Sequence, residues 1–170
     1  MNTIRSLMDR VLGATICVLM GIMVLNVIWQ VFTRFIIGQP SSFTEEAARY
    51  MMIWAGLLGA AYACGSKSHL ALDLITGRLT GARKRISEIF IQLCALAFSV
   101  GVLIIGGGRL VWIQLQLGQL SAAMQWKLGY VYLAVPVAGG FIAIYSLFAL
   151  IEALRGDDAA GQPAQGEGRS

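Results

Sequence analysis

The chain has 170 residues, of which 57% are hydrophobic and only 13% are charged, and its mean hydropathy is +0.70. Soluble domains carry about 25% charged residues, so this composition excludes an ordinary soluble domain and indicates an integral membrane protein. The net charge of +4 does not point to nucleic acid, because the Lys and Arg residues lie in short segments between apolar runs, where membrane orientation explains them.

Four charge-free apolar runs predict four transmembrane helices, at residues 11–33, 50–66, 89–108 and 128–151. A spanning helix needs about 20 apolar residues, and only the second run is slightly short. The first run exceeds a typical signal-peptide core and no small-residue cleavage pattern follows it, so we expect a retained span. Within it Asn26 and Gln30, one helical turn apart, are expected to hydrogen-bond to a neighbouring helix.

The segment before the second run carries a helix start signal. Ser42, with Glu45 three residues later, has the pattern of a capping box, so the second helix is expected to begin near Phe43. Glu45 and Glu46 then lie in its first turns, where the helix dipole favours acidic residues. Two interpretations remain open for them: capping of the helix, or contact with a partner together with Arg34 and Arg49.

The second helix is rich in small residues. Gly56 and Ala60 are four residues apart, as are Ala55 and Gly59, and this spacing allows close approach of another helix. The pattern does not distinguish packing within the chain from packing against a second protein.

Residues 66–79 predict a helix lying on the cytoplasmic membrane surface, with Leu72, Ile75 and Leu79 at helical spacing. The single histidine, His69, has no second ligand of the kind a metal site needs, so we predict no metal site and no cofactor. Nine of the 13 Lys and Arg residues are expected on the same side of the membrane as this segment and the two termini. This excess predicts that both termini are cytoplasmic.

The remaining features argue against independent chemistry or transport. Cys17, Cys64 and Cys94 form no CxxC or metal-type spacing and are expected to be buried thiols. No acidic or basic residue lies near the centre of a predicted span, whereas ion-coupled transporters retain such residues. We therefore expect one four-helix membrane domain at 1–155 and a disordered cytoplasmic tail at 156–170.

The chain contains, in this order, QVFTRF at 30–35, FTEEAARY at 43–50 with Trp54, GAA at 59–61, HLALD at 69–73, and GYVYLAVPVAGG at 129–140. Together these segments resemble the small membrane subunit (the DctQ-like component) of tripartite ATP-independent periplasmic (TRAP) transporters. The resemblance covers nearly all of the chain except its tail. One departure is Phe43, where the family often has Trp, and both residues are aromatic.

The resemblance implies a non-catalytic subunit in the bacterial inner membrane. It would brace a large membrane subunit that carries an organic acid with sodium, after a periplasmic substrate-binding protein has captured that acid. Arg34, Glu45, Glu46, Arg49 and Trp54 are the candidate partner contacts, and Gly56, Gly59 and Ala60 the candidate helix-packing residues. A four-helix membrane oxidoreductase and a stand-alone small exporter remain as alternatives.

Overall fold

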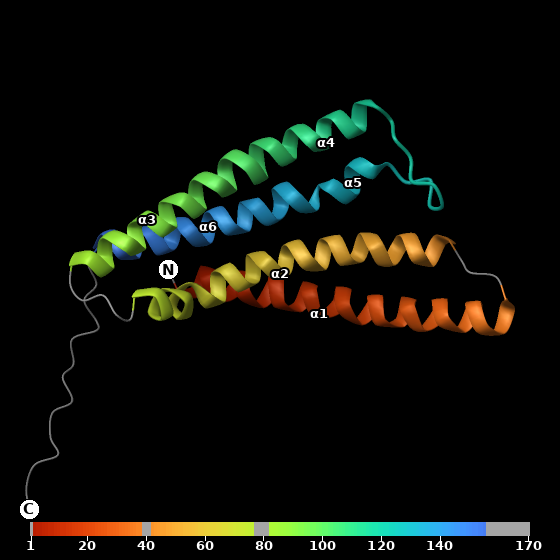
Figure 1. Cartoon of the computed structure of the whole chain (residues 1–170), viewed down its shortest axis with the longest axis horizontal. Coiled ribbons are helices and arrows are strands. Elements are labelled where there is room, and N and C mark those ends of the chain that lie inside the picture. The colour runs from red at the N-terminus through yellow and green to blue at the C-terminus, as the bar shows by residue number, and fades with distance from the viewer. Residues whose placement is uncertain (1, 39–41, 77–81, 156–170) are drawn as a thin grey trace, which may run out of the picture.

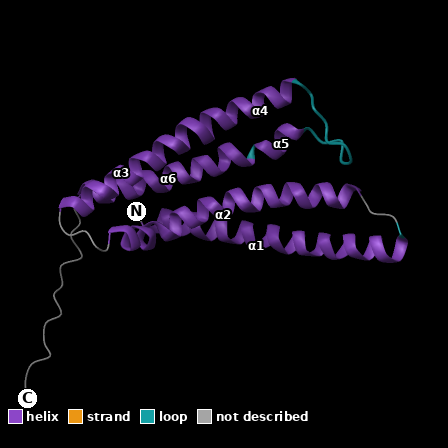
Figure 2. Ribbon diagram, in the orientation of Figure 1, coloured by secondary structure: helices purple, strands orange, loops and turns teal. Residues whose placement is uncertain are grey.

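The structure is a computed structural model that describes residues 2–38, 42–76 and 82–155, and this part of the chain is helical except for short loops, without a named strand. Figure 2 shows the helices in purple and the loop at residues 117–127 in teal. An all-α protein was predicted, and this is confirmed. The elements, in chain order, are α1 (Asn2–Phe32), η1 (Thr33–Ile37), α2 (Ser42–Thr76), α3 (Ala82–Phe98), η2 (Ser99–Gly106), α4 (Gly107–Gln116), α5 (Leu128–Tyr132) and α6 (Ala134–Arg155), where η marks a π-helix.

Three stretches of the described chain are long and apolar enough to cross a membrane: Arg5–Ile36, Ile89–Gln116 and Leu128–Leu154. They match the first, third and fourth predicted spans. The second predicted span lies in α2, which is helical but is not among these three. Its run is short and built largely from Gly, Ala and aromatic residues, which contribute less hydropathy than Leu, Ile and Val, so its role as a fourth span stays a prediction.

Helix α2 begins at Ser42, one residue before the predicted start. Ser42 therefore lies inside the helix, and the residue at the capping position falls outside the described residues. The backbone remains helical through Thr76, so the predicted surface segment starts as a continuation of α2. Residues 77–81, the side chains of His69 and of the Arg83–Arg85 cluster, and the tail at 156–170 lie outside the described part.

The helices form two hairpins, one from α1 and α2 and the other from α3–η2–α4 and α5–α6 (Figure 1). We call the end that holds the start of α1 and the end of α6 the near end, and the opposite end the far end. Helices α2 and α6 lie in the middle, and the core at the near half of the bundle is formed by Leu12, Leu58 and Tyr145. Toward the far end the two hairpins diverge, and the 117–127 loop returns toward α2.

Two features position the second hairpin. Pro136 has no N–H to donate to the preceding turn, and the helix is interrupted at Leu133, between α5 and α6. In the facing helix the backbone widens into the π-helix η2, where the buried Ser99 hydroxyl donates a hydrogen bond to the Gly139 carbonyl at 2.6 Å. A Cβ atom at Gly139 would lie 2.6 Å from the Leu103 Cβ, so η2 and α6 approach as closely as glycine allows.

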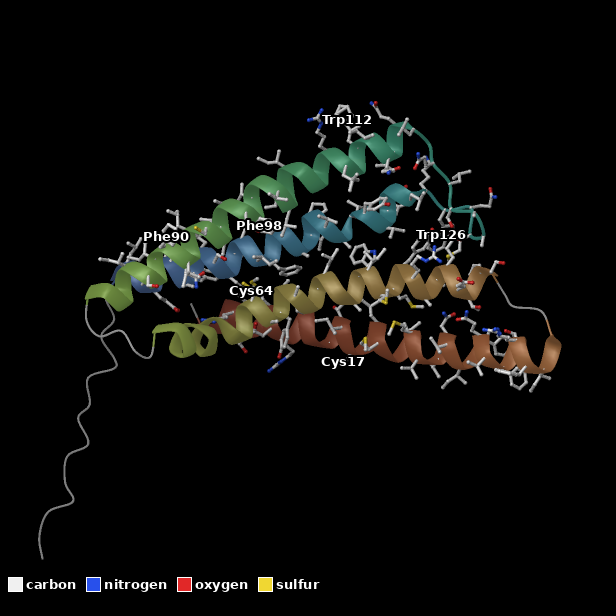
Figure 3. All side chains as sticks on the ribbon, in the orientation of Figure 1. Cys17, Cys64, Phe90, Phe98, Trp112 and Trp126 are labelled. Atoms are coloured by element: carbon white, nitrogen blue, oxygen red, sulfur yellow. The ribbon has the colours of Figure 1, made fainter. Side chains whose placement is uncertain are left out.

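The outward faces of the helices are apolar. Figure 3 shows Phe90 and Trp112 on the outer side of the second hairpin, and both side chains are more than half exposed. The prediction that the cysteines are buried is wrong for Cys17 and Cys94, which are free and exposed, whereas Cys64 is partly buried. A bundle this thin leaves much of each helix facing outward, where lipid accepts an apolar thiol as readily as a protein core does.

Candidate partner-binding surfaces

Four of the five predicted contact residues lie at the far end, all except Trp54, and the structure separates these four into two groups. Arg34, in η1, is exposed, and Glu45 is exposed and pairs with Arg49 one turn later at 3.5 Å. This ion pair lies on the surface of α2, where such pairs contribute at most about 0.5 kcal/mol. Arg34, Glu45 and Arg49 therefore remain accessible for a partner.

Glu46 points instead into its own chain. Its Oε2 atom accepts hydrogen bonds from the backbone N–H groups of Ala123 at 2.8 Å and Met124 at 3.0 Å. Its Oε1 atom accepts a hydrogen bond from the Tyr50 hydroxyl at 2.7 Å. Neither interpretation from the sequence, capping or partner contact, anticipated this link between α2 and the 117–127 loop.

These donors stabilise the ionised form of Glu46. A hydrogen bond from the Ser121 side chain, followed by that from Tyr50, lowers the pKa of the carboxyl group from 4.5 to about 2, with further lowering by the two backbone N–H groups. Partial desolvation acts in the opposite direction but is outweighed. At neutral pH Glu46 is therefore a carboxylate held by four donors.

The first hairpin is closed at the same end by Asn26. Its side-chain amide donates to the backbone carbonyl of Thr44, a buried residue in the first turn of α2, at 2.8 Å. The expected hydrogen bond from Asn26 to a neighbouring helix is thus confirmed.

A polar cluster at the near end was not predicted. Arg5 donates to the carbonyl of Gly65 at 2.7 Å and lies 3.8 Å from the Glu152 carboxylate, and the Tyr145 hydroxyl donates to Asp9 at 2.5 Å. The cluster joins α1, α2 and α6. Tyr145 stood out in the sequence as a polar residue in the fourth run, but its partner is 136 residues away, and no local pattern indicates such a pair.

The small residues of α2 are divided between two faces. Ala55 and Ala61 are buried within the chain. Gly56 and Ala60 are exposed, and a Cβ atom added at Gly56 or Gly59 would meet nothing within 4 Å. The chain therefore does not use these two glycines for its own close packing.

Trp54 differs from the other candidate contacts because it is partly buried and packs against the core of Leu12, Leu58 and Tyr145. No group of three or more His, Cys, Asp or Glu side chains that could hold a metal ion occurs among the described residues.

The geometry thus defines a small helical membrane protein with apolar outward faces and polar contacts at both ends. Residues 23–156 match the family model described as the DctQ component of tripartite ATP-independent periplasmic transporters. The chain belongs to this family. Members of this family are components of transporters and not enzymes, which removes the oxidoreductase alternative.

Two curated relatives agree with this assignment. The chain is 33% identical over 102 residues to the isethionate TRAP transporter permease protein DctMQ of Oleidesulfovibrio alaskensis, a match that covers 60% of the chain and 16% of that protein. It is 26% identical over 107 residues to the sialic acid TRAP transporter small permease protein SiaQ of Vibrio cholerae, covering 63% of the chain and 61% of that protein. The chain thus spans less than two thirds of the length of each of these relatives.

Proposed function

We propose that this chain is a non-catalytic brace for a large membrane subunit during sodium-coupled uptake of an organic acid that a periplasmic binding protein delivers. The observation that carries the proposal is the open glycine face of α2, at Gly56 and Gly59. No charged residue lies in the middle of the apolar runs, so the chain lacks the ionisable groups by which transporters couple ion movement to substrate. A scaffold role needs only shape and contact.

The α2 face is where we place the large subunit. Met52, Gly56 and Ala60 follow one another at helical spacing and are all exposed, while α1 and α6 pack on other sides of the helix. Helix α2 is also less apolar than the three other candidate spans, which suits a helix that protein rather than lipid covers. The match to DctMQ occupies only 16% of a much longer permease chain, which supports association of such a segment with a larger part.

Bulky substitutions test this placement. Gly56→Leu and Ala60→Leu should leave the chain folded, because neither position faces its own core, but should abolish copurification with the large subunit. Gly21→Leu is the matched control, since Gly21 on α1 is also exposed with nothing within 4 Å of an added Cβ. Equal loss of the complex with Gly21→Leu, or its retention with Gly56→Leu, would exclude the α2 face.

The far end is the proposed periplasmic side, and the exposed charges there are the proposed contacts with the binding protein. The pairing of Arg5 with Glu152 brings the start of α1 and the end of α6 to the same side, in agreement with two cytoplasmic termini. The excess of basic residues on that side supports the same orientation in a bacterial inner membrane, with residues 66–79 on the cytoplasmic surface.

Charge reversal at the exposed arginines tests the proposed contacts with the binding protein and leaves unchanged the hydrogen bonds that Glu46 makes within the chain. Arg34→Glu and Arg49→Glu should reduce uptake in proteoliposomes that contain both membrane subunits and the binding protein, without loss of the membrane complex. Uptake unchanged in both variants would remove these residues from the docking surface. Uptake by the small chain alone would overturn the brace itself.

A further inference from the structure

The two hairpins are held together differently at their two ends. At the near end, Arg5, Asp9 and Tyr145 join α1, α2 and α6 in a cluster next to the core. At the far end the two hairpins diverge, and the 117–127 loop crosses back to the start of α2 (Figure 1). The carboxylate of Glu46 accepts hydrogen bonds from this loop.

The loop has a defined conformation of its own. The N–H of Ser121 donates to the Trp126 carbonyl at 2.8 Å and that of Leu128 to the Gln119 carbonyl at 3.0 Å, as in a short hairpin. Its tip turns at Gln125, which has a positive φ of 57°. The loop therefore meets α2 as a preformed unit rather than as a chain that α2 must order.

Two consecutive N–H groups at this tip, those of Ala123 and Met124, converge on one oxygen of Glu46. Successive N–H groups in a turn form a concave site that suits an anion. Within the described part of the chain the Met124 N–H has one other acceptor, the Ser121 hydroxyl, at the longer distance of 3.3 Å. The carboxylate is thus the main acceptor that α2 offers to the loop.

We propose that Glu46 is a positioning residue whose carboxylate clasps the tip of the 117–127 loop and thereby sets the separation of the two hairpins at the far end. The contact between Glu46 and the loop does not depend on the proposed brace function. Only its functional consequence rests on that proposal, because a brace must keep a fixed shape. Glu45 takes no part in the clasp, because its carboxylate pairs with Arg49 on the surface of α2. The two adjacent acids therefore provide a variant and its control.

The first measurement is amide hydrogen exchange on the full chain in detergent at neutral pH. In Glu46→Ala, exchange at Ala123 and Met124 should accelerate by about tenfold or more, as expected when bonds to a charged acceptor are lost. Glu46→Gln keeps the side-chain shape with a weaker neutral acceptor and should give a smaller acceleration. Glu45→Ala should leave these amides unchanged, and protection in α6 should be the same in every variant.

The second measurement separates the clasp from a purely local role in the loop. Spin labels at Phe35 in η1 and Leu117 at the start of the loop, both exposed, report the separation of the hairpins. The distance distribution should broaden in Glu46→Ala and Glu46→Gln but not in Glu45→Ala. The proposal would be overturned if exchange at Ala123 and Met124 were unchanged in Glu46→Ala, or if its distance distribution were as narrow as that of the chain with Glu46. Either result holds whether or not the complex with the large subunit forms.

Discussion

Gly65 on α2 lies directly against the ring of Tyr145 on α6, so that a Cβ atom added to the glycine would sit 2.6 Å from the Cε1 and Cζ atoms of the ring. The ring is buried, and its hydroxyl is hydrogen-bonded to Asp9. The ring is therefore not free to shift and make room for the added Cβ atom. This contact fixes how closely the first hairpin approaches the second at the near end.

Gly65→Ala should therefore destabilise the chain. Overpacking costs about 1–3 kcal/mol, which exceeds the gain of up to about 1 kcal/mol from replacing a helical glycine with alanine. Gly59→Ala is the matched control on the same helix, because the added Cβ meets nothing within 4 Å, and it should be neutral or stabilising. Thermal unfolding in detergent, followed by circular dichroism, measures both, and equal melting temperatures would contradict the close contact.

Two adjacent glycines on α6 give an independent test of the π-helix packing. Gly139→Ala places a Cβ atom 2.6 Å from the Leu103 Cβ and 3.3 Å from its backbone, whereas Gly140→Ala meets nothing within 4 Å. We expect Gly139→Ala to lower the free energy of unfolding by about 1–3 kcal/mol and Gly140→Ala to have no unfavourable effect. Equal stability of the two variants would show that η2 and α6 lie further apart than these distances indicate.

The hydroxyl of Tyr145 stabilises the near end through its bond to Asp9. Tyr145→Phe keeps the ring and removes the donor, and should cost about 1.5–3 kcal/mol, the range for hydrogen bonds to charged groups. Tyr130→Phe, at an exposed tyrosine, should change stability by less than about 0.5 kcal/mol. If Asp9→Asn in the Tyr145→Phe background lowers stability as much as it does in the unmodified chain, the two residues are not coupled.

The sequence was sufficient for the three spans that the structure supports and for the start of α2, because apolar runs and start signals are local. It placed the start of α2 within one residue and identified Asn26 as an interhelical hydrogen-bond donor. It did not reveal that Glu46 binds backbone groups at Ala123 and Met124, because those donors are 77 and 78 residues away and carry no side-chain signature. Long-range polar contacts follow from how the hairpins assemble, and this is also why the Asp9–Tyr145 pair was missed.

The clasp should make the far end sensitive to acid. The pKa of Glu46 is lowered from 4.5 to about 2 by the Ser121 side chain, Tyr50 and the loop N–H groups, so its contribution to stability is fully present above pH 4.5 and is lost as the pH falls from 4.5 toward 2. Glu45, one residue earlier on the same helix, pairs with Arg49 on the exposed surface and serves as the control. Denaturant unfolding at a series of pH values should therefore show a fall in stability over this interval, which Glu46→Gln removes and Glu45→Gln retains. A fall of the same size in Glu46→Gln would assign the acid sensitivity to another carboxyl group and leave the loop contact without a role in folding.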